Sequence, residues 1–289
     1  MDLALPAPVL PRSARLVLLA GFAAMYLPTY WWAATTIWQT DDQAHGAIIL
    51  IVVAWLFWKR RRAILEALAE PAPVAGWACF VLGLLLYVVG RSQDVSIFQI
   101  GSQIPVLAGA LLLLGGRPAV RAAWFPLLYI VFMIPLPGIL VDAVTAPLKQ
   151  WISLIAENVL YAAGYPIARS GVVISIGQYQ LLVADACSGL HSMYSLSALG
   201  ALFMYLVGRR SVIHNLAMVA SILPIAFTAN VVRVMFLVLL TYHFGDETGQ
   251  GFLHGAAGMV LILAALLFLL LLDRLLARLI RPRPQASHG

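Results

Sequence analysis

Long stretches of apolar residues, separated by short polar or charged segments, dominate the pattern of this chain. A helix that crosses a lipid bilayer needs about 20 mostly apolar residues, and about eight stretches approach that length. We predict membrane-spanning helices over residues 14–34, 44–58, 74–90, 97–114, 122–140, 186–207, 212–240 and 254–272. The pattern therefore predicts an all-α polytopic membrane protein, with residues 1–289 forming a single membrane-embedded domain.

The segment between the fifth and sixth predicted spans, the outer loop 138–185, has room for structure outside the membrane. Its first part, "ILVDAVTAPLKQWISLIAENVLYAAG", has apolar residues at helical spacing, which predicts an amphipathic helix in the membrane interface, interrupted near Pro147. Its second part, "GVVISIGQYQLLVAD", has β-branched residues before Gly177 and Gln178 and apolar residues after them, which predicts a small β-hairpin.

Composition and charge agree with a membrane location. Hydrophobic residues make up 62% of the chain and charged residues 10%, and this leaves too little polar surface for a water-soluble globule. Lys and Arg are retained on the cytoplasmic side of short loops, and placing both termini in the cytoplasm puts 14 of the 18 there. Because topology accounts for the basic clusters, we expect no nucleic acid as a partner.

Three reactive side chains fall in the outer parts of the last three predicted spans. Cys187 opens the sixth span, His254 opens the eighth, and Arg233 lies in the seventh, roughly 10 Å below its outer end. Each residue taken singly is commonly structural, as we expect for the other cysteine, Cys79, which lies too far from Cys187 for a disulfide. The shared depth of the three side chains favours a functional site, because ionisable groups inside a membrane cost several kcal/mol.

The chemistry of the three groups is that of covalent acyl transfer. If Asp185 is an N-cap, Cys187 falls at the second position of a helix, where unpaired N–H groups and the helix dipole favour a thiolate. Arg233 can supply a positive charge to that thiolate or stabilise the oxyanion of a tetrahedral intermediate. His254 can then take a proton from the thiol and give one to a leaving amine.

Two other arrangements of these residues stay open. His191 follows Cys187 by four residues and shares its helix face, so it is an alternative base. The set of Cys187, His191, His254 and Asp185 also contains the ligand types that bind Zn²⁺. No HExxH or CxxC spacing accompanies them, so we expect neither a metal nor another cofactor.

Three motifs make the chain resemble the exosortase/archaeosortase family, the membrane-embedded counterparts of sortases. They are "VADACSGL" at 183–190, "NVVR" at 230–233 and "FLHGAAG" at 252–258, in that order and on successive predicted spans. Supporting segments are "DDQAHG" at 41–46, ahead of a span that ends in "WKRRR", and "FMIPLPGILVDAVTAPLKQ" at 132–150. The variant "QTDDQAHG" at 39–46 favours the exosortase B subgroup.

The resemblance implies a cysteine protease or transpeptidase of the bacterial inner membrane, with its active site facing the periplasm. It implies exported proteins with C-terminal sorting signals of the PEP-CTERM kind as substrates, a thioester acyl-enzyme, an unidentified acceptor nucleophile or water, and a link to exopolysaccharide production. We also expect membrane lipids to be in contact with the protein. By position, the family's catalytic Cys, Arg and His correspond to Cys187, Arg233 and His254. Asp185, Ser188 and Asn230 are the supporting residues of these motifs.

Two positions add less to this resemblance. The acid before the cysteine is often Glu in the family, and here it is Asp185, a residue that caps a helix at least as well. His45 matches a recurrent His-Gly pair of an outer loop and receives no chemical role.

The leading alternative function is a non-catalytic membrane component or transporter of a polysaccharide system, in which Arg233 binds an anionic ligand.

Overall fold

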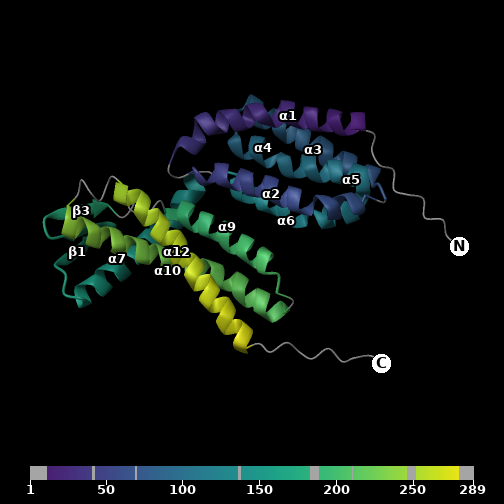
Figure 1. Ribbon diagram of the computed structural model, residues 1–289. Helices are drawn as coiled ribbons and strands as arrows, with labels where there is room; N and C mark the ends of the chain where they lie inside the picture. Colours follow the sequence, from purple (N-terminus) through teal and green to yellow (C-terminus); the bar gives the residue numbers. More distant parts are fainter. Residues whose placement is uncertain are drawn as a thin grey trace, which may run out of the picture. The chain divides into compact units, whose positions relative to one another are not determined.

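The computed structural model describes residues 12–40, 43–68, 70–135, 138–182, 189–209, 211–245 and 252–279. The chain divides into two compact units, Met1–Pro137 and Gly138–Gly289 (Figure 1). The expected single domain over residues 1–289 stays a prediction.

The first unit is built from helices of very different lengths. Its elements are α1 (Arg12–Thr35), η1 (Ile37–Gln39), α2 (His45–Glu66), α3 (Pro73–Ser92), α4 (Ser96–Gly101), α5 (Gln103–Ala122), α6 (Trp124–Tyr129) and η2 (Ile130–Met133). Buried polar contacts join α1 to the α4–α5 segment: the hydroxyl of Tyr26 lies 2.9 Å from that of Ser102, and Gln99 donates to Thr29 at 2.9 Å. Such bonds tie helices together where the surroundings are apolar.

Five helical segments of the described residues are long and apolar enough to cross a membrane. They are Leu16–Gln39, Pro73–Ser92, Ser96–Ala122, Val212–Phe244 and Gly258–Leu279. These segments fall on five of the eight predicted spans, which confirms the helical, membrane-type architecture without confirming the number eight. Helices α2 and α9 (Gly189–Val207) cover two further predicted spans and contain 22 and 19 residues.

The predicted continuous span over 122–140 is wrong. Helix α6 and the 3₁₀ turn η2 together end at Met133, Ile134 is extended, and a new helix begins at Gly138. The cause is Pro135, because a proline ring pushes the residue before it out of the helical region. The apolar helix Trp124–Met133 contains only ten residues, or about 15 Å, half the thickness of the hydrocarbon layer.

In its described residues, the second unit combines four long helices with a small sheet. Its elements are α7 (Gly138–Ala162), β1 (Ile167–Ser170), β2 (Val173–Ile176), β3 (Tyr179–Leu182), α9, α10 (Val212–Phe244) and α12 (Phe252–Leu279). The predicted interruption near Pro147 is wrong, because α7 is continuous through that residue. A proline in a helix removes one hydrogen bond and bends the helix, which does not oblige the helix to end.

The predicted hairpin is confirmed, and the structure adds a strand to it. Strands β2 and β3 pair antiparallel, with Ile176 opposite Tyr179, so Gly177 and Gln178 form a two-residue turn. Gly177 has a φ of 58°, which a glycine adopts without strain. Strand β1 pairs on the other side of β2, in the order β1-β2-β3. The sequence signal missed β1, because "IARS" lacks the run of β-branched residues of its neighbour.

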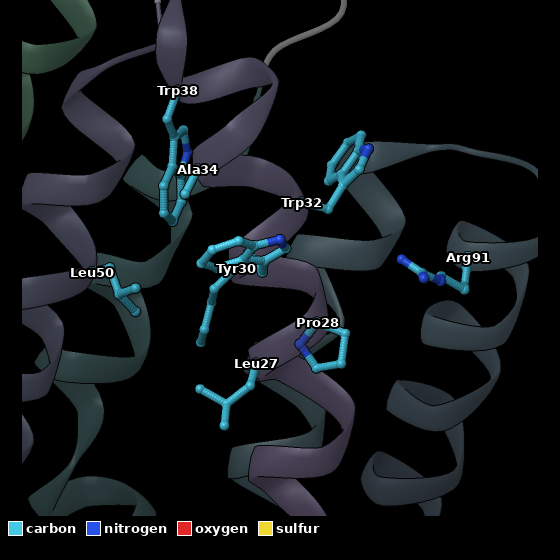
Figure 2. Close-up of a pocket in the computed structure, with 9 residues that line it drawn as sticks. Leu27, Pro28, Tyr30, Trp32, Ala34, Trp38, Leu50 and Arg91 are labelled. Carbon is cyan, nitrogen blue, oxygen red and sulfur yellow. The ribbon is translucent and has the colours of Figure 1, made fainter.

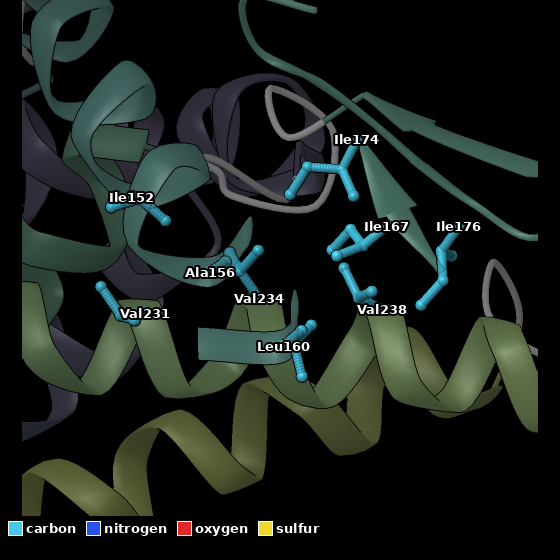
Figure 3. Packing of buried hydrophobic residues seen from close by; sticks show 9 residues of the cluster. All are labelled: Ile152, Ala156, Leu160, Ile167, Ile174, Ile176, Val231, Val234 and Val238. Carbon is cyan, nitrogen blue, oxygen red and sulfur yellow. The ribbon is translucent and has the colours of Figure 1, made fainter. Parts of the chain in front are cut away.

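Helix α10 is the centre of the second unit, because it packs against α7, α9, α12 and the sheet. One of its faces buries Val231, Val234 and Val238 against α7 and the sheet, as Figure 3 shows. The other members of this sheet-side core are Ile152, Ala156, Leu160, Ile167, Ile174 and Ile176. A second face of α10 buries Ala226 and Ala229 against α9 and α12.

We expect the sheet-side core to be sensitive to loss of side-chain volume. Ile174→Ala should lower the free energy of unfolding in detergent by about 3 kcal/mol, because Ile174 is fully buried in β2 and its truncation leaves a cavity. Leu182→Ala is the matched control, since Leu182 is 40% exposed on the neighbouring strand. Equal losses in the two variants would show that the sheet does not pack as described.

Candidate functional site

Helices α9, α10 and α12 pack against one another and share a buried cluster. Leu196, Ala226, Ala229, Leu261 and Ala265 form this cluster, which we call the three-helix core. Alanines at such contacts let helix backbones approach closely in a membrane protein. These are also the helices that carry, or directly follow, the three residues of the predicted catalytic site.

Asn230 and Arg233 lie one turn apart on α10, and both are buried, with exposed fractions of 0% and 6%. Arg233 follows Ala226 by seven residues, or about two turns, so it lies on the face of α10 that enters the three-helix core. A cation buried inside apolar helices is costly, which makes Arg233 a candidate functional residue.

The packing of α10 against α12 determines where His254 lies along the helix pair relative to Arg233. The two helices run antiparallel, because His214 near the start of α10 lies 2.9 Å from Asp273 near the end of α12. Arg233 follows His214 by 19 residues, and His254 precedes Asp273 by the same number. The third residue of α12 therefore lies at the level of Arg233 along the helix pair.

The three-helix core also shows which face of each helix carries Arg233 and His254. Leu261 of α12 belongs to that core, and His254 precedes it by seven residues, as Arg233 follows Ala226 by seven. A step of seven residues returns to nearly the same face of a helix. The backbone of His254 thus lies on the face of α12 toward α10; its side chain lies outside the described residues.

The remaining predicted site residues fall largely outside the described part of the chain. Asp185, Cys187 and Ser188 lie in the segment 183–188, so the predicted N-cap and the position of the thiol stay predictions. His191 is the third residue of α9, and its side chain is likewise not described. The alternative Zn²⁺ ligand set consists only of such residues, so it too lies outside the described side chains.

The sequence named Asn230 but did not reveal the surroundings of its side-chain amide. Its amide nitrogen and oxygen are both buried and have no hydrogen-bond partner in the part of the chain that the structure describes. Leaving a buried polar group without a partner costs about 1–3 kcal/mol. A donor and an acceptor held beside Arg233 at that cost are suited to a polar group that enters the site.

Comparison with protein families gives a match for most of the chain. The model of the transmembrane exosortase family matches residues 31–271 of the 289. The chain belongs to this family. The comparisons with curated proteins and with solved structures give no match.

Membership in this family agrees with the architecture. The matched region of the exosortase contains the candidate site residues from Asp185 to His254. Together with the five long apolar helices, the match makes this exosortase a multi-pass membrane protein.

The first unit of the exosortase contains an apolar cleft of about 760 Å³ (Figure 2). Tyr30, Trp31, Trp32 and Trp38 line it, and Arg91 of α3 supplies its charge. Aromatic residues with a cation are typical of a membrane–water interface. The side chains that line the cleft include no Cys, Ser, His or carboxylate, so the cleft is the weaker candidate for an active site.

Trp38, which lines this cleft, gives a structural reason for the glycine of the His-Gly pair at 45–46. A Cβ atom on Gly46 would overlap the indole ring of Trp38, so glycine at this position lets the ring pack against α2. His45 is the first residue of that helix. The recurrent glycine therefore has a packing role.

We expect Asn230→Leu to leave the melting temperature in detergent unchanged or raised, because Asn230 gives up no hydrogen bond to the described residues and leucine has a similar volume. Gln99→Leu is the matched control: Gln99 is also buried, but its amide donates to Thr29, so this variant should lose about 1–3 kcal/mol. A similar destabilisation in both would mean that the Asn230 amide is paired in the folded protein.

Proposed function

We propose that this exosortase is a membrane-embedded cysteine peptidase or transpeptidase that cleaves C-terminal sorting signals of exported proteins. Cys187 is the nucleophile, Arg233 the electrostatic stabiliser and His254 the general acid and base. The burial of Arg233 and Asn230 on α10, level with the first turn of α12, is the observation that carries the proposal. Family membership supports the same class of reaction.

The reaction proceeds in two acyl-transfer steps. The thiolate of Cys187 attacks the scissile carbonyl carbon, a C–S bond forms, and the carbonyl oxygen becomes an oxyanion that accepts hydrogen bonds from the guanidinium of Arg233. Collapse of this intermediate breaks the C–N bond, and His254 protonates the departing amine. An acceptor nucleophile, or water, then attacks the thioester and gives its proton to His254, and the C–S bond breaks to release the product and the Cys187 thiolate.

Asn230 has a defined part in this scheme. Its Nδ2–H donates to the carbonyl side of a peptide group and its Oδ1 accepts from an N–H, so one amide side chain can hold the substrate backbone next to the scissile bond. Holding the substrate in the reactive geometry raises the rate of the chemical step. Asp185 and Ser188 belong to the motif around the nucleophile, where a helix start would stabilise the thiolate.

The substrate fits a site inside the outer part of the membrane. A sorting signal of the PEP-CTERM kind places a short motif beside a hydrophobic span and a basic tail. With the site facing the periplasm and both termini in the cytoplasm, that motif reaches the level of Arg233 while the span remains in lipid. We accordingly propose the bacterial inner membrane as the location, and exopolysaccharide export as the associated process.

A transporter or other non-catalytic component is the second candidate, because a buried Arg233 also suits an anionic headgroup or sugar phosphate. In that case the thiol has no role. The effect of Cys187→Ala therefore separates the two functions.

Co-expression with an exported protein that ends in such a signal tests the proposal. Wild type should yield a cleaved product, and Cys187→Ala should abolish it. Arg233→Ala and His254→Ala should each lower the rate by about 10²–10³-fold. Mass spectrometry of the product, and of any thioester on Cys187, is the measurement.

His191→Ala is the matched control and should retain activity. Retention of activity in His254→Ala together with its loss in His191→Ala would transfer the role of base to His191. Full processing by Cys187→Ala would exclude a cysteine enzyme.

A further inference from the structure

A charged cluster with a buried carboxylate lies at the opposite end of helices α9, α10 and α12 from Arg233. The carboxylate of Asp273 receives two hydrogen bonds from the Arg209 guanidinium, at 3.1 Å from Nε and 2.6 Å from Nη2, and lies 2.9 Å from Nε2 of His214. The side chains of Asp273 and His214 are 8% and 4% exposed. An ionised carboxylate accepts hydrogen bonds only, so Nε2 of His214 carries the hydrogen.

The cluster joins all three helices at one point. Arg209 lies between α9 and α10, His214 is in the first turn of α10, and Asp273 is near the end of α12. Arg209 and Ser211 are themselves tied to α10, because the Asn215 side chain donates to the carbonyl of Arg209 at 2.9 Å and Ser211 caps the helix. Hydrogen bonds to Asp273 also raise the pKa of Arg209, so the guanidinium stays charged.

Most of the apolar surface of α12 repeats along the helix, apart from Ala264 and Ala265. Residues 259–272, "MVLILAALLFLLLL", are all apolar, and leucines one turn apart offer nearly the same surface. Apolar packing of this kind tolerates a slide of one helical turn, about 5.4 Å. A buried polar contact, by contrast, loses its partner on sliding, which is how such groups specify register.

We propose that the Arg209–Asp273–His214 cluster is a register clamp that positions α12 so that His254 lies level with Arg233. Arg233 is 19 positions from His214 and His254 is 19 from Asp273, about 28 Å along their helices. Asp273 is thus a positioning residue, which acts on the reaction through His254. The effect on catalysis rests on the proposed function; the effect on register does not.

Cross-linking measures the register without any activity. In a background of Cys79→Ser with Cys187→Ala, the substitution Ala226→Cys is combined in turn with Gly258→Cys, Leu261→Cys or Ala265→Cys, and disulfide yields are compared under mild oxidation in membranes. With Asp273 present we expect Leu261→Cys to dominate, because it is level with Ala226. Asp273→Ala should redistribute the yields among the three positions.

The matched control is Glu157→Gln, which breaks the 3.0 Å ion pair between Glu157 of α7 and Arg169 of β1 in the same unit. This variant loses an ion pair outside the clamp and should keep the Leu261→Cys preference. Arg209→Gln is a second clamp variant that leaves the apolar core intact, and it should shift the yields in the direction of Asp273→Ala. Unchanged yields in both clamp variants would overturn the clamp.

Kinetics test the consequence for the reaction. Asp273→Ala should lower kcat by about 100-fold with KM changed less than about twofold, because a misplaced base impairs the chemical step rather than binding. Asp273→Glu keeps the carboxylate and should restore much of kcat. Redistributed cross-links with an unchanged kcat would overturn the positioning role. Redistributed cross-links in a chain whose wild type cleaves no sorting signal would support the clamp and contradict the proposed function.

Discussion

The burial of Arg233 inside a bundle of apolar helices is the constraint on which the second unit depends. A guanidinium in such surroundings is stable only where neighbouring helices enclose it and supply polar groups or a ligand. Helices α9 and α12 enclose this part of α10. In the sequence, α9 directly follows the segment that contains Cys187, and α12 contains His254.

Helix α10 is enclosed by its neighbours because two of its faces are buried. Its alanines admit α9 and α12, and its valines, on another face, hold α7 and the three-stranded sheet. At the far end of the helix the sheet also packs against it, with Gly177 close to the ring of Tyr242. The three-stranded sheet is therefore attached to the same helix that carries Asn230 and Arg233.

The sequence predicted the helices and the hairpin well, because apolar runs and β-branched alternation are local signals. The candidate chemistry stays a prediction. Two errors arose at prolines. Pro135 ends a helix where the apolar run continues, whereas Pro147 lies within one, and the difference depends on the neighbouring residues and on packing. The clamp was missed because the predicted eighth span ended one residue before Asp273, and the partner His214 is distant in sequence.

The polar environment of the site was only partly predictable. The "NVVR" motif marked Asn230 and Arg233, but the unpaired amide of Asn230 is a property of three-dimensional burial among the described residues that no spacing encodes. The level of His254 relative to Arg233 likewise follows from the antiparallel register of α10 and α12, which a contact between residues 59 positions apart establishes.

The most direct test of the account is a disulfide between Cys187 and position 254. In a Cys79→Ser background, His254→Cys should cross-link to Cys187 under mild oxidation, since a disulfide requires Cα atoms within about 7 Å. Met259→Cys, farther along α12 and 60% exposed, should not. Cross-linking of Cys187 to Met259→Cys in preference to His254→Cys would contradict a single pocket for the thiol, the guanidinium and the imidazole.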